Sequence, residues 1–146
     1  MARLIGGIVA GLVAAFLGIW LVEMLGHLFY PLPAELSVRN PQSVAAYIAM
    51  MPLGAQAFVI AAWLGGALVG AAVAVATSGR DWTGWTIAAV VACAGILNIL
   101  MIPHPAVMQI GAVAAPLVGG LLGIHLGRRL HRPSGASAPE PQHGEV

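Results

Sequence analysis

The chain has 146 residues, of which 60% are hydrophobic and only 8% are charged, and its mean hydropathy is +0.92. A water-soluble domain of this length could not bury so much apolar surface, so the composition excludes an ordinary soluble protein and indicates a membrane protein. The net charge is only +1, and nucleic-acid binding needs a basic patch, so we expect no nucleic-acid partner.

Four long stretches are apolar enough to cross a bilayer, which takes about 20 residues of helix. They lie at residues 4–28, 54–77, 82–102 and 106–127. The first is longer than the apolar core of a signal peptide, and no small-residue cleavage site follows it, so we expect it to be retained. The pattern predicts an all-α membrane fold, in which residues 1–130 form a bundle of four transmembrane helices.

Two positions carry capping signals for helix starts. Asp81 precedes the third span, where we expect it to be the N-cap. In the connection between the first two spans, Asn40 is a good N-cap and Pro41 suits the first helical position. Apolar side chains then recur at helical spacing, at Val44, Tyr47, Ile48 and Met51. We predict a short extracytoplasmic amphipathic helix here, lying on the outer membrane surface or on the bundle.

Arginine predicts the orientation of the chain. Five of the six arginines lie before the first span, between the second and third spans, or after the fourth, and only Arg39 lies in the first connection. The positive-inside rule therefore places both termini in the cytoplasm. Residues 131–146 are polar, without apolar periodicity, and we predict a disordered cytoplasmic tail.

Small residues recur four positions apart in three of the spans. The first span has the pair Gly7 and Gly11, the second has the pair Gly66 and Gly70, and the fourth has the triplet Gly119, Gly123 and Gly127. Such patterns let helix backbones approach closely in a bilayer. They predict tight packing between helices, within this chain at least as often as between copies of it.

Glu23 is the only acid inside the four spans, and His27 follows it one helical turn later. An ionisable group at membrane depth is costly and is a functional-site hypothesis by default. Helical phase puts both residues opposite the face that carries Gly7 and Gly11. We therefore expect contacts on both sides of the first helix, one of them from another helix or from a second subunit.

A metal site is one interpretation of these polar residues. Glu23 and His27, together with His104 between two prolines, form a set of two histidines and one carboxylate. The five internal methionines fall in the same outer half of the membrane: Met24, Met50, Met51, Met101 and Met108. Their thioethers would favour copper(I).

Two other interpretations remain open. Glu23 and His27 could exchange protons in a transporter, although transporter sites usually lie nearer the midplane. Alternatively, Glu23 accepts a hydrogen bond from His27, Asn98 or the outer loop and pins the helix ends together. This structural interpretation is favoured because buried polar groups are usually hydrogen-bonded within the protein. In it, the methionines fill gaps in the packing and His104 is a polar loop tip.

No motif points to catalysis, since the chain has no zinc-protease helix, glycine-rich phosphate loop or nucleophile–base set. We expect no enzyme activity and no cofactor. The leading expectation is a non-enzymatic protein that acts in the lipid bilayer through helix packing with itself, as a homo-oligomer, or with a membrane partner. The alternative is a transporter or a metal- or proton-handling protein with an outer site at Glu23, His27 and His104.

Two segments, residues 23–31 (EMLGHLFYP) and 98–105 (NILMIPHP), resemble a group of uncharacterised small bacterial four-helix integral membrane proteins. The resemblance extends over most of residues 4–127. The resemblance implies this topology and a bacterial inner membrane. It implies no activity, substrate or site residue.

Overall fold

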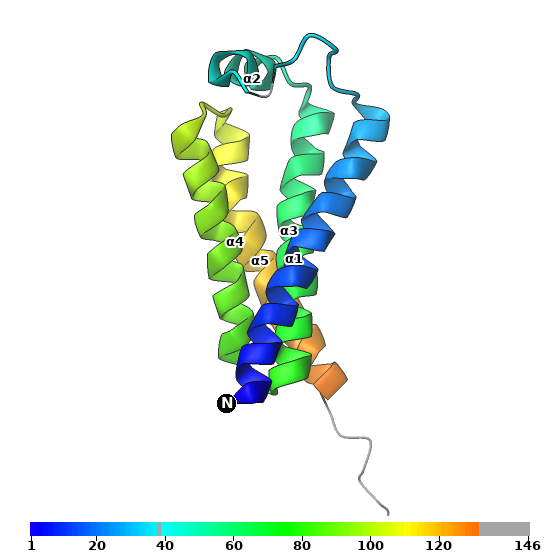
Figure 1. Cartoon of the computed structure of the whole chain (residues 1–146), viewed down its shortest axis with the longest axis vertical. Helices are drawn as coiled ribbons and strands as arrows, with labels where there is room; N and C mark the ends of the chain where they lie inside the picture. Colours follow the sequence, from blue (N-terminus) through cyan, green and yellow to red (C-terminus); the bar gives the residue numbers. More distant parts are fainter. Residues whose placement is uncertain (38, 132–146) are drawn as a thin grey trace, which may run out of the picture.

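The computed structural model describes residues 1–37 and 39–131, and all regular secondary structure in them is helical (Figure 1). The helices are α1 (Ala2–Phe29), α2 (Pro41–Ala49), α3 (Leu53–Ser78), α4 (Asp81–Met101) and α5 (Ala106–His131). All except α2 are long and apolar enough to cross a membrane. The all-α prediction is confirmed, and four such helices are what a multi-pass membrane protein requires.

The long helices start and end within two residues of the predicted spans, with one exception. Helix α5 continues past residue 127 to His131, whose Nδ1 donates a hydrogen bond to the carbonyl oxygen of Ala76 at 2.8 Å. His131 therefore belongs to the helix and not to the predicted tail. The rest of that tail, residues 132–146, lies outside the described part of the chain.

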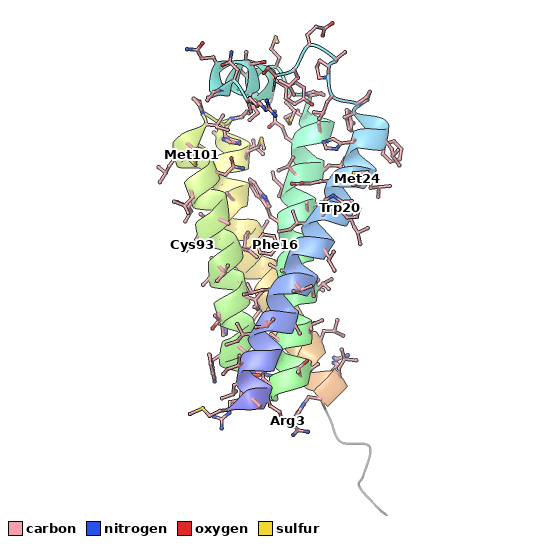
Figure 2. The ribbon with its side chains drawn as sticks, in the orientation of Figure 1. Arg3, Phe16, Trp20, Met24, Cys93 and Met101 are labelled. Carbon is pink, nitrogen blue, oxygen red and sulfur yellow. The ribbon has the colours of Figure 1, made fainter. Side chains whose placement is uncertain are left out.

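The molecule has two distinct ends, which we name by what they contain. The arginine end comprises the start of α1, the end of α3, the start of α4 and the end of α5, whereas the α2 end comprises the opposite helix ends and α2 itself (Figure 1). Arg3 marks the first end, and Met24 and Met101 lie toward the second (Figure 2).

Helix α3 packs against α1, α4 and α5, and its contacts with α1 and α5 run through the predicted small residues. A methyl group added to Gly11 of α1 would lie 2.8 Å from both the Gly70 carbonyl oxygen and Ala74 Cβ on α3. A methyl group on Gly127 of α5 would lie 2.7 Å from the Ala72 carbonyl oxygen. The small-residue patterns are therefore used for packing within this chain.

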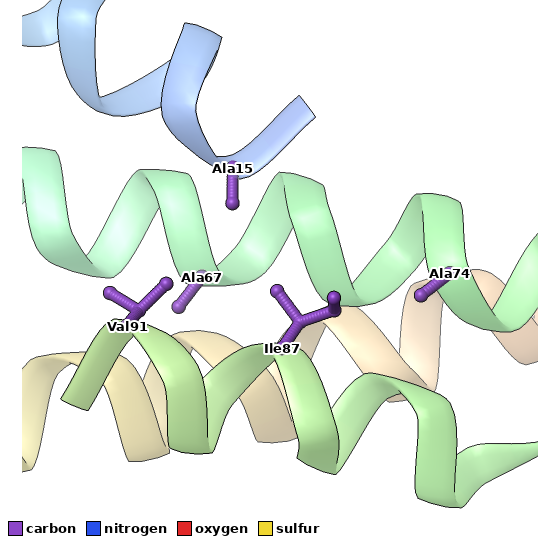
Figure 3. Close-up of a cluster of buried hydrophobic side chains, with 5 residues drawn as sticks. All are labelled: Ala15, Ala67, Ala74, Ile87 and Val91. Carbon is purple, nitrogen blue, oxygen red and sulfur yellow. The ribbon is translucent and has the colours of Figure 1, made fainter. Parts of the chain in front are cut away.

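A cluster of buried side chains joins α1, α3 and α4 (Figure 3). Its members are Ala15, Ala67, Ala74, Ile87 and Val91. Ile87 is fully buried and approaches both α1 and α3, because a methyl group on Gly11 or Gly70 would meet it at 3.1 or 2.9 Å. Helices α1 and α4 are thus in close contact at this level.

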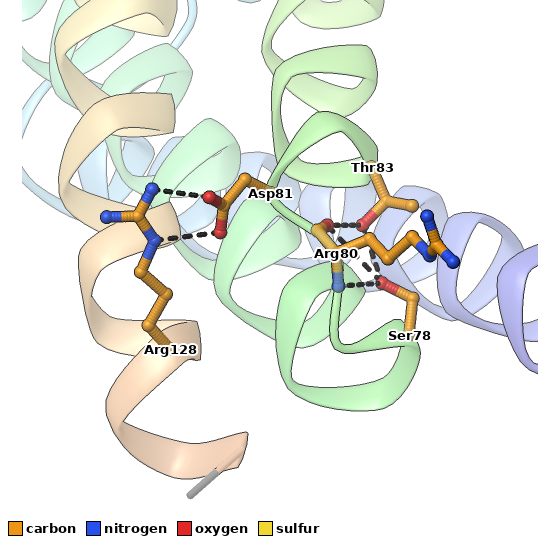
Figure 4. Close-up of polar contacts among 5 residues, drawn as sticks. All are labelled: Ser78, Arg80, Asp81, Thr83 and Arg128. Atoms are coloured by element: carbon orange, nitrogen blue, oxygen red, sulfur yellow. Dashed lines mark hydrogen bonds and ion pairs between the residues drawn. The ribbon is translucent and has the colours of Figure 1, made fainter.

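Polar groups at the arginine end are bonded to one another (Figure 4). Arg128 Nε of α5 donates to Asp81 Oδ1 of α4 at 2.8 Å, and its Nη2 pairs with Oδ2. Thr83 Oγ1 donates to the Arg80 carbonyl oxygen at 2.7 Å and lies 2.8 Å from Ser78 Oγ. The prediction for Asp81 is wrong: Arg80 is the N-cap, and Asp81 is the first helical residue, where it holds α5 instead.

At the opposite end, α2 lies across the long helices (Figure 1). The predicted start of α2 is confirmed, since Asn40 Oδ1 accepts a hydrogen bond from the backbone N–H of Gln42 at 3.0 Å and Pro41 is the first residue. Ile48 of α2 is buried in one cluster with Trp63 of α3 and Met108 of α5. One face of α2 therefore packs on the long helices.

Candidate functional site

A pocket of about 320 Å³ lies beneath α2 and is lined by all five helices and by the loop between α4 and α5. Its volume is within the range of small-molecule sites, which is about 300 to 1,000 Å³. Its wall is mainly apolar and aromatic, with Tyr30, Tyr47 and Phe58 among the lining residues. A few polar side chains in an apolar wall are typical of a ligand site.

Glu23, His27 and His104, the three predicted site residues, all line this pocket. Glu23 and His27 come from α1, and His104 comes from the loop that joins α4 to α5. Asn98 near the end of α4 lines it as well. Residues more than seventy positions apart in the sequence are therefore brought to one cavity.

The Glu23 side chain is partly buried, and no hydrogen bond or ion pair to its carboxylate is found within residues 1–37 and 39–131. The structural interpretation needs such a bond from His27, Asn98 or the outer loop. Glu23 instead contributes an unpaired acceptor to the pocket wall. Glu23 thus has contacts within a single chain, whereas Phe16 and Trp20 on the same face of α1 are 62% and 55% exposed.

His104 is buried, with 8% of its surface exposed, and is not the loop tip that the structural interpretation assumed. Its Nδ1 lies 2.6 Å from the Ile102 carbonyl oxygen, and Nδ1 is the donor because a carbonyl oxygen only accepts. Its own carbonyl oxygen accepts from Gln109 Nε2 at 2.8 Å. In the neutral ring Nε2 is then a hydrogen-bond acceptor, held in a fixed tautomer.

The three predicted metal ligands line one pocket, but they are not grouped closely enough to hold a metal ion between them. Within the described ranges, no three side chains of His, Cys, Asp or Glu are grouped closely enough to hold a metal ion. Met51 and Met108 line the pocket, whereas Met50 and Met101 are each 79% exposed. A metal site at Glu23, His27 and His104 stays a prediction.

A second cavity of about 180 Å³ lies between α1 and α4. Leu12 and Phe16 line it from α1, Ala94 lines it from α4, and Trp63 of α3 lies between these helices. Asn98 lines both cavities, which makes them neighbours. The sequence predicts neither this groove nor Trp63 in its wall, because no local pattern indicates how far apart two helices lie.

Aromatic contacts hold the end of α1 on α3 beside the pocket. The ring centroids of Phe29 and Phe58 are 5.7 Å apart in a stacked arrangement, and those of Tyr30 and Phe58 are 6.0 Å apart edge to face. Such pairs each contribute about 0.5–1.5 kcal/mol beyond burial of area. The wall that carries Glu23 and His27 is therefore fixed against α3, and Gly26 of α1 packs on Phe58 as well, since a methyl group there would lie 3.1 Å from Phe58 Cβ.

Comparison with known proteins adds no assignment to this geometry. No family model, no curated protein and no solved structure matches the chain. What the pocket offers chemically is a carboxylate at Glu23 and an acceptor nitrogen at His104, set in an apolar wall. Such a wall suits binding of a ligand that donates hydrogen bonds or carries positive charge.

Proposed function

We propose that this protein is a non-enzymatic, multi-pass protein of the bacterial inner membrane that binds a small ligand in its outer-side pocket. Its fold would be a transmembrane four-helix bundle with α2 as an extracytoplasmic cover. The observation that carries the proposal is that Glu23, His27 and His104 line one cavity. The alternative expected from the sequence was a transporter or a metal- or proton-handling protein with an outer site at these residues, and the proposal extends it to binding of a small ligand.

The orientation follows from the arginine end. Arg3, Arg80, Arg128 and Arg129 belong to helix ends on that side, and only Arg39 belongs to the α2 end among the described arginines. Under the positive-inside rule the arginine end faces the cytoplasm and the pocket faces outward. The resemblance to small bacterial membrane proteins supports the inner membrane as the location.

Cysteine labelling tests this orientation. In a Cys93→Ala background, His27→Cys introduces a thiol at the exposed rim of the pocket, and Thr77→Cys introduces one at the exposed end of α3. A membrane-impermeant maleimide should label His27→Cys in intact spheroplasts and Thr77→Cys only after permeabilisation. The reverse pattern would invert the topology.

The ligand proposal is tested by filling the pocket. Ala55 is 6% exposed and lines the cavity, whereas Ala57 two positions later on α3 is exposed and lines neither cavity. Protein purified in mild detergent from its native membrane should release a small molecule detectable by mass spectrometry. Ala57→Phe should retain it, and Ala55→Phe should lose it at an unchanged melting temperature.

Two outcomes would contradict this proposal. One is a wild-type protein that releases no bound molecule at all. The other is the same bound molecule in the same amount from the wild type, Ala55→Phe and Ala57→Phe, since that molecule would then lie elsewhere.

Helix packing with another copy or a membrane partner is the second candidate, and one observation favours it. Only 17% of the most apolar stretch of α1 is buried, compared with 50% in α3 and in α5. Trp20 and Leu21 are 55% and 59% exposed on α1 and are available to lipid or to another helix. Disulfide crosslinking of Trp20→Cys in a Cys93→Ala background should trap a dimer if copies pack here, and only monomer would remove packing between copies at this face.

A further inference from the structure

The pocket and the groove are neighbouring cavities, the first with polar groups in its wall and the second with an apolar wall. Asn98 lines both cavities and marks where they meet. Beyond Asn98, the groove is lined by apolar side chains of α1, α3 and α4. The pocket holds the polar groups Glu23, His27 and His104. A molecule that fits both must itself be amphipathic.

The pocket and the groove together extend over a length that matches one leaflet of a bilayer. The groove begins at Leu12 of α1, and Glu23 lies in the pocket eleven residues further along the same helix. At about 1.5 Å per residue this separation is about 16 Å. It equals roughly half of a hydrocarbon core about 30 Å thick. The alkyl chain of an amphiphile whose head lies beside Glu23 would therefore extend to about the midplane.

The groove opens sideways at the molecular surface, between α1 and α4. Phe16 of α1 and Val90 of α4 line it and are 62% and 39% exposed, so they form its rims. Trp63 of α3 is 6% exposed and forms its floor. A hydrocarbon chain could enter from the surrounding lipid without passing a polar group.

The charges at the polar end select the head group. Glu23 is the acid in the pocket wall, and none of the arginines that the structure describes lines either cavity. The Glu23 carboxylate is an acceptor, and so is Nε2 of the His104 ring in its neutral form. A protonated amine supplies the donors and the positive charge that complement them, whereas a phosphate or carboxylate head would need Arg or Lys.

We propose that the pocket and groove together bind a single-chain amphiphile with an amine head, which lies beside Glu23 while its alkyl chain follows the groove to Trp63. This inference rests on the proposed function, because it names the class of ligand for the same pocket. In this complex Glu23 is the counter-ion of the amine head, and α1 and α4 flank the alkyl chain.

Quenching of Trp63 provides a direct test with the full-length protein. The other three tryptophans, Trp20, Trp82 and Trp85, are 55%, 48% and 44% exposed, so each can be changed to Phe, which leaves Trp63 as the only indole. The protein is placed in nanodiscs of unbrominated phosphatidylcholine. The probe is octadecylamine with two bromines at mid-chain, and the matched probes are the corresponding fatty acid and fatty alcohol.

The amine should quench Trp63 saturably, at a concentration at least tenfold lower than the acid. Glu23→Gln should remove the advantage of the amine and leave the alcohol unchanged. Ala94 lines the groove and Ala89 on the same helix does not, although both are exposed. Ala94→Phe should therefore abolish quenching by all three probes, and Ala89→Phe should not.

The inference is overturned if the amine gives no saturable quenching, if the acid binds more tightly, or if Glu23→Gln leaves the amine affinity unchanged. These results are separable from failure of the proposed function. A molecule that still co-purifies with the wild type and not with Ala55→Phe would leave the pocket proposal standing with a different ligand. Absence of both signals would remove both proposals. Melting temperatures of all variants in nanodiscs confirm that each is folded.

Discussion

The arginine end and the α2 end of this molecule use the same helices in opposite ways. At the arginine end the helices meet through glycine and alanine, and the polar side chains Ser78, Asp81, Thr83 and Arg128 bond to other groups of the chain (Figure 4). At the α2 end α1 and α4 are separated by cavities, and the Glu23 carboxylate makes no hydrogen bond or ion pair within the described residues, with His27 one helical turn away.

We infer from this difference a division between helix ends that provide stability and a candidate site. Polar groups that are bonded to one another hold helix ends together, whereas an unpaired carboxylate in an apolar wall costs free energy. Proteins tolerate such local conflicts mainly at functional sites. We therefore regard the arginine end as the scaffold and the α2 end as the site, and the following variants test that division in order of expected effect.

The largest effect should come from a single methyl group in the tight interface. A methyl on Gly123 of α5 would collide with the Leu68 carbonyl oxygen and lie 2.9 Å from Ala71 Cβ, and backbone of α3 cannot move aside cheaply. Gly123→Ala should lower the free energy of unfolding by about 1–3 kcal/mol. SDS titration followed by tryptophan fluorescence measures this change.

Gly6→Ala is the matched control, since nothing lies within 4 Å of a methyl group there. It should leave the free energy of unfolding unchanged or slightly raised, because alanine is the better helix former. Equal losses in the two variants would mean that α3 and α5 do not pack as described.

A smaller loss should follow from removing one hydroxyl at the arginine end. Thr83 is fully buried, and valine has nearly its shape without the hydrogen bonds to Arg80 and Ser78. Thr83→Val should cost about 1 kcal/mol in the same titration. Ser78 and Arg80 are accessible to water, so a cost several times larger would point to a role for Thr83 beyond these bonds.

Much of the fold was predictable because its signals are local. Asn40 and Pro41 mark the start of α2, the prolines around His104 separate α4 from α5, and the spans follow from hydropathy. The ends of α4 and α5 were less predictable: Asp81 resembles a cap but pairs with Arg128, a residue 47 positions away. Only tertiary structure reveals such a partner.

The polar residues of the candidate site were predictable from local sequence, whereas its aromatic residues were not. Glu23, His27 and His104 stand out as polar residues in apolar surroundings, and all three line the pocket. Trp63 and Phe58 carry no such signal, since an aromatic residue in an apolar helix is ordinary. The place of Trp63 depends on the separation of α1 from α4, and that of Phe58 on the approach of α1 to α3, and no residue pattern encodes either.

At the α2 end, loss of a polar group should affect stability less. His104→Ala removes the hydrogen bond to the Ile102 carbonyl oxygen, but the adjoining cavity is open to water, which can replace it. We expect a loss of about 0.5 kcal/mol, at the low end for a single hydrogen bond. A loss above that of Thr83→Val, measured in the same detergent, would make His104 part of the scaffold.

If Glu23 serves binding and not stability, native mass spectrometry of Glu23→Gln over a temperature ramp tests both roles at once. Glu23→Gln should unfold at the wild-type temperature or slightly above it and should have lost the bound small molecule, while the arginine-end variant Asp81→Asn retains that molecule. A Glu23→Gln protein that unfolds well below the wild type, or that keeps the molecule at full occupancy, would show that Glu23 does not have this role.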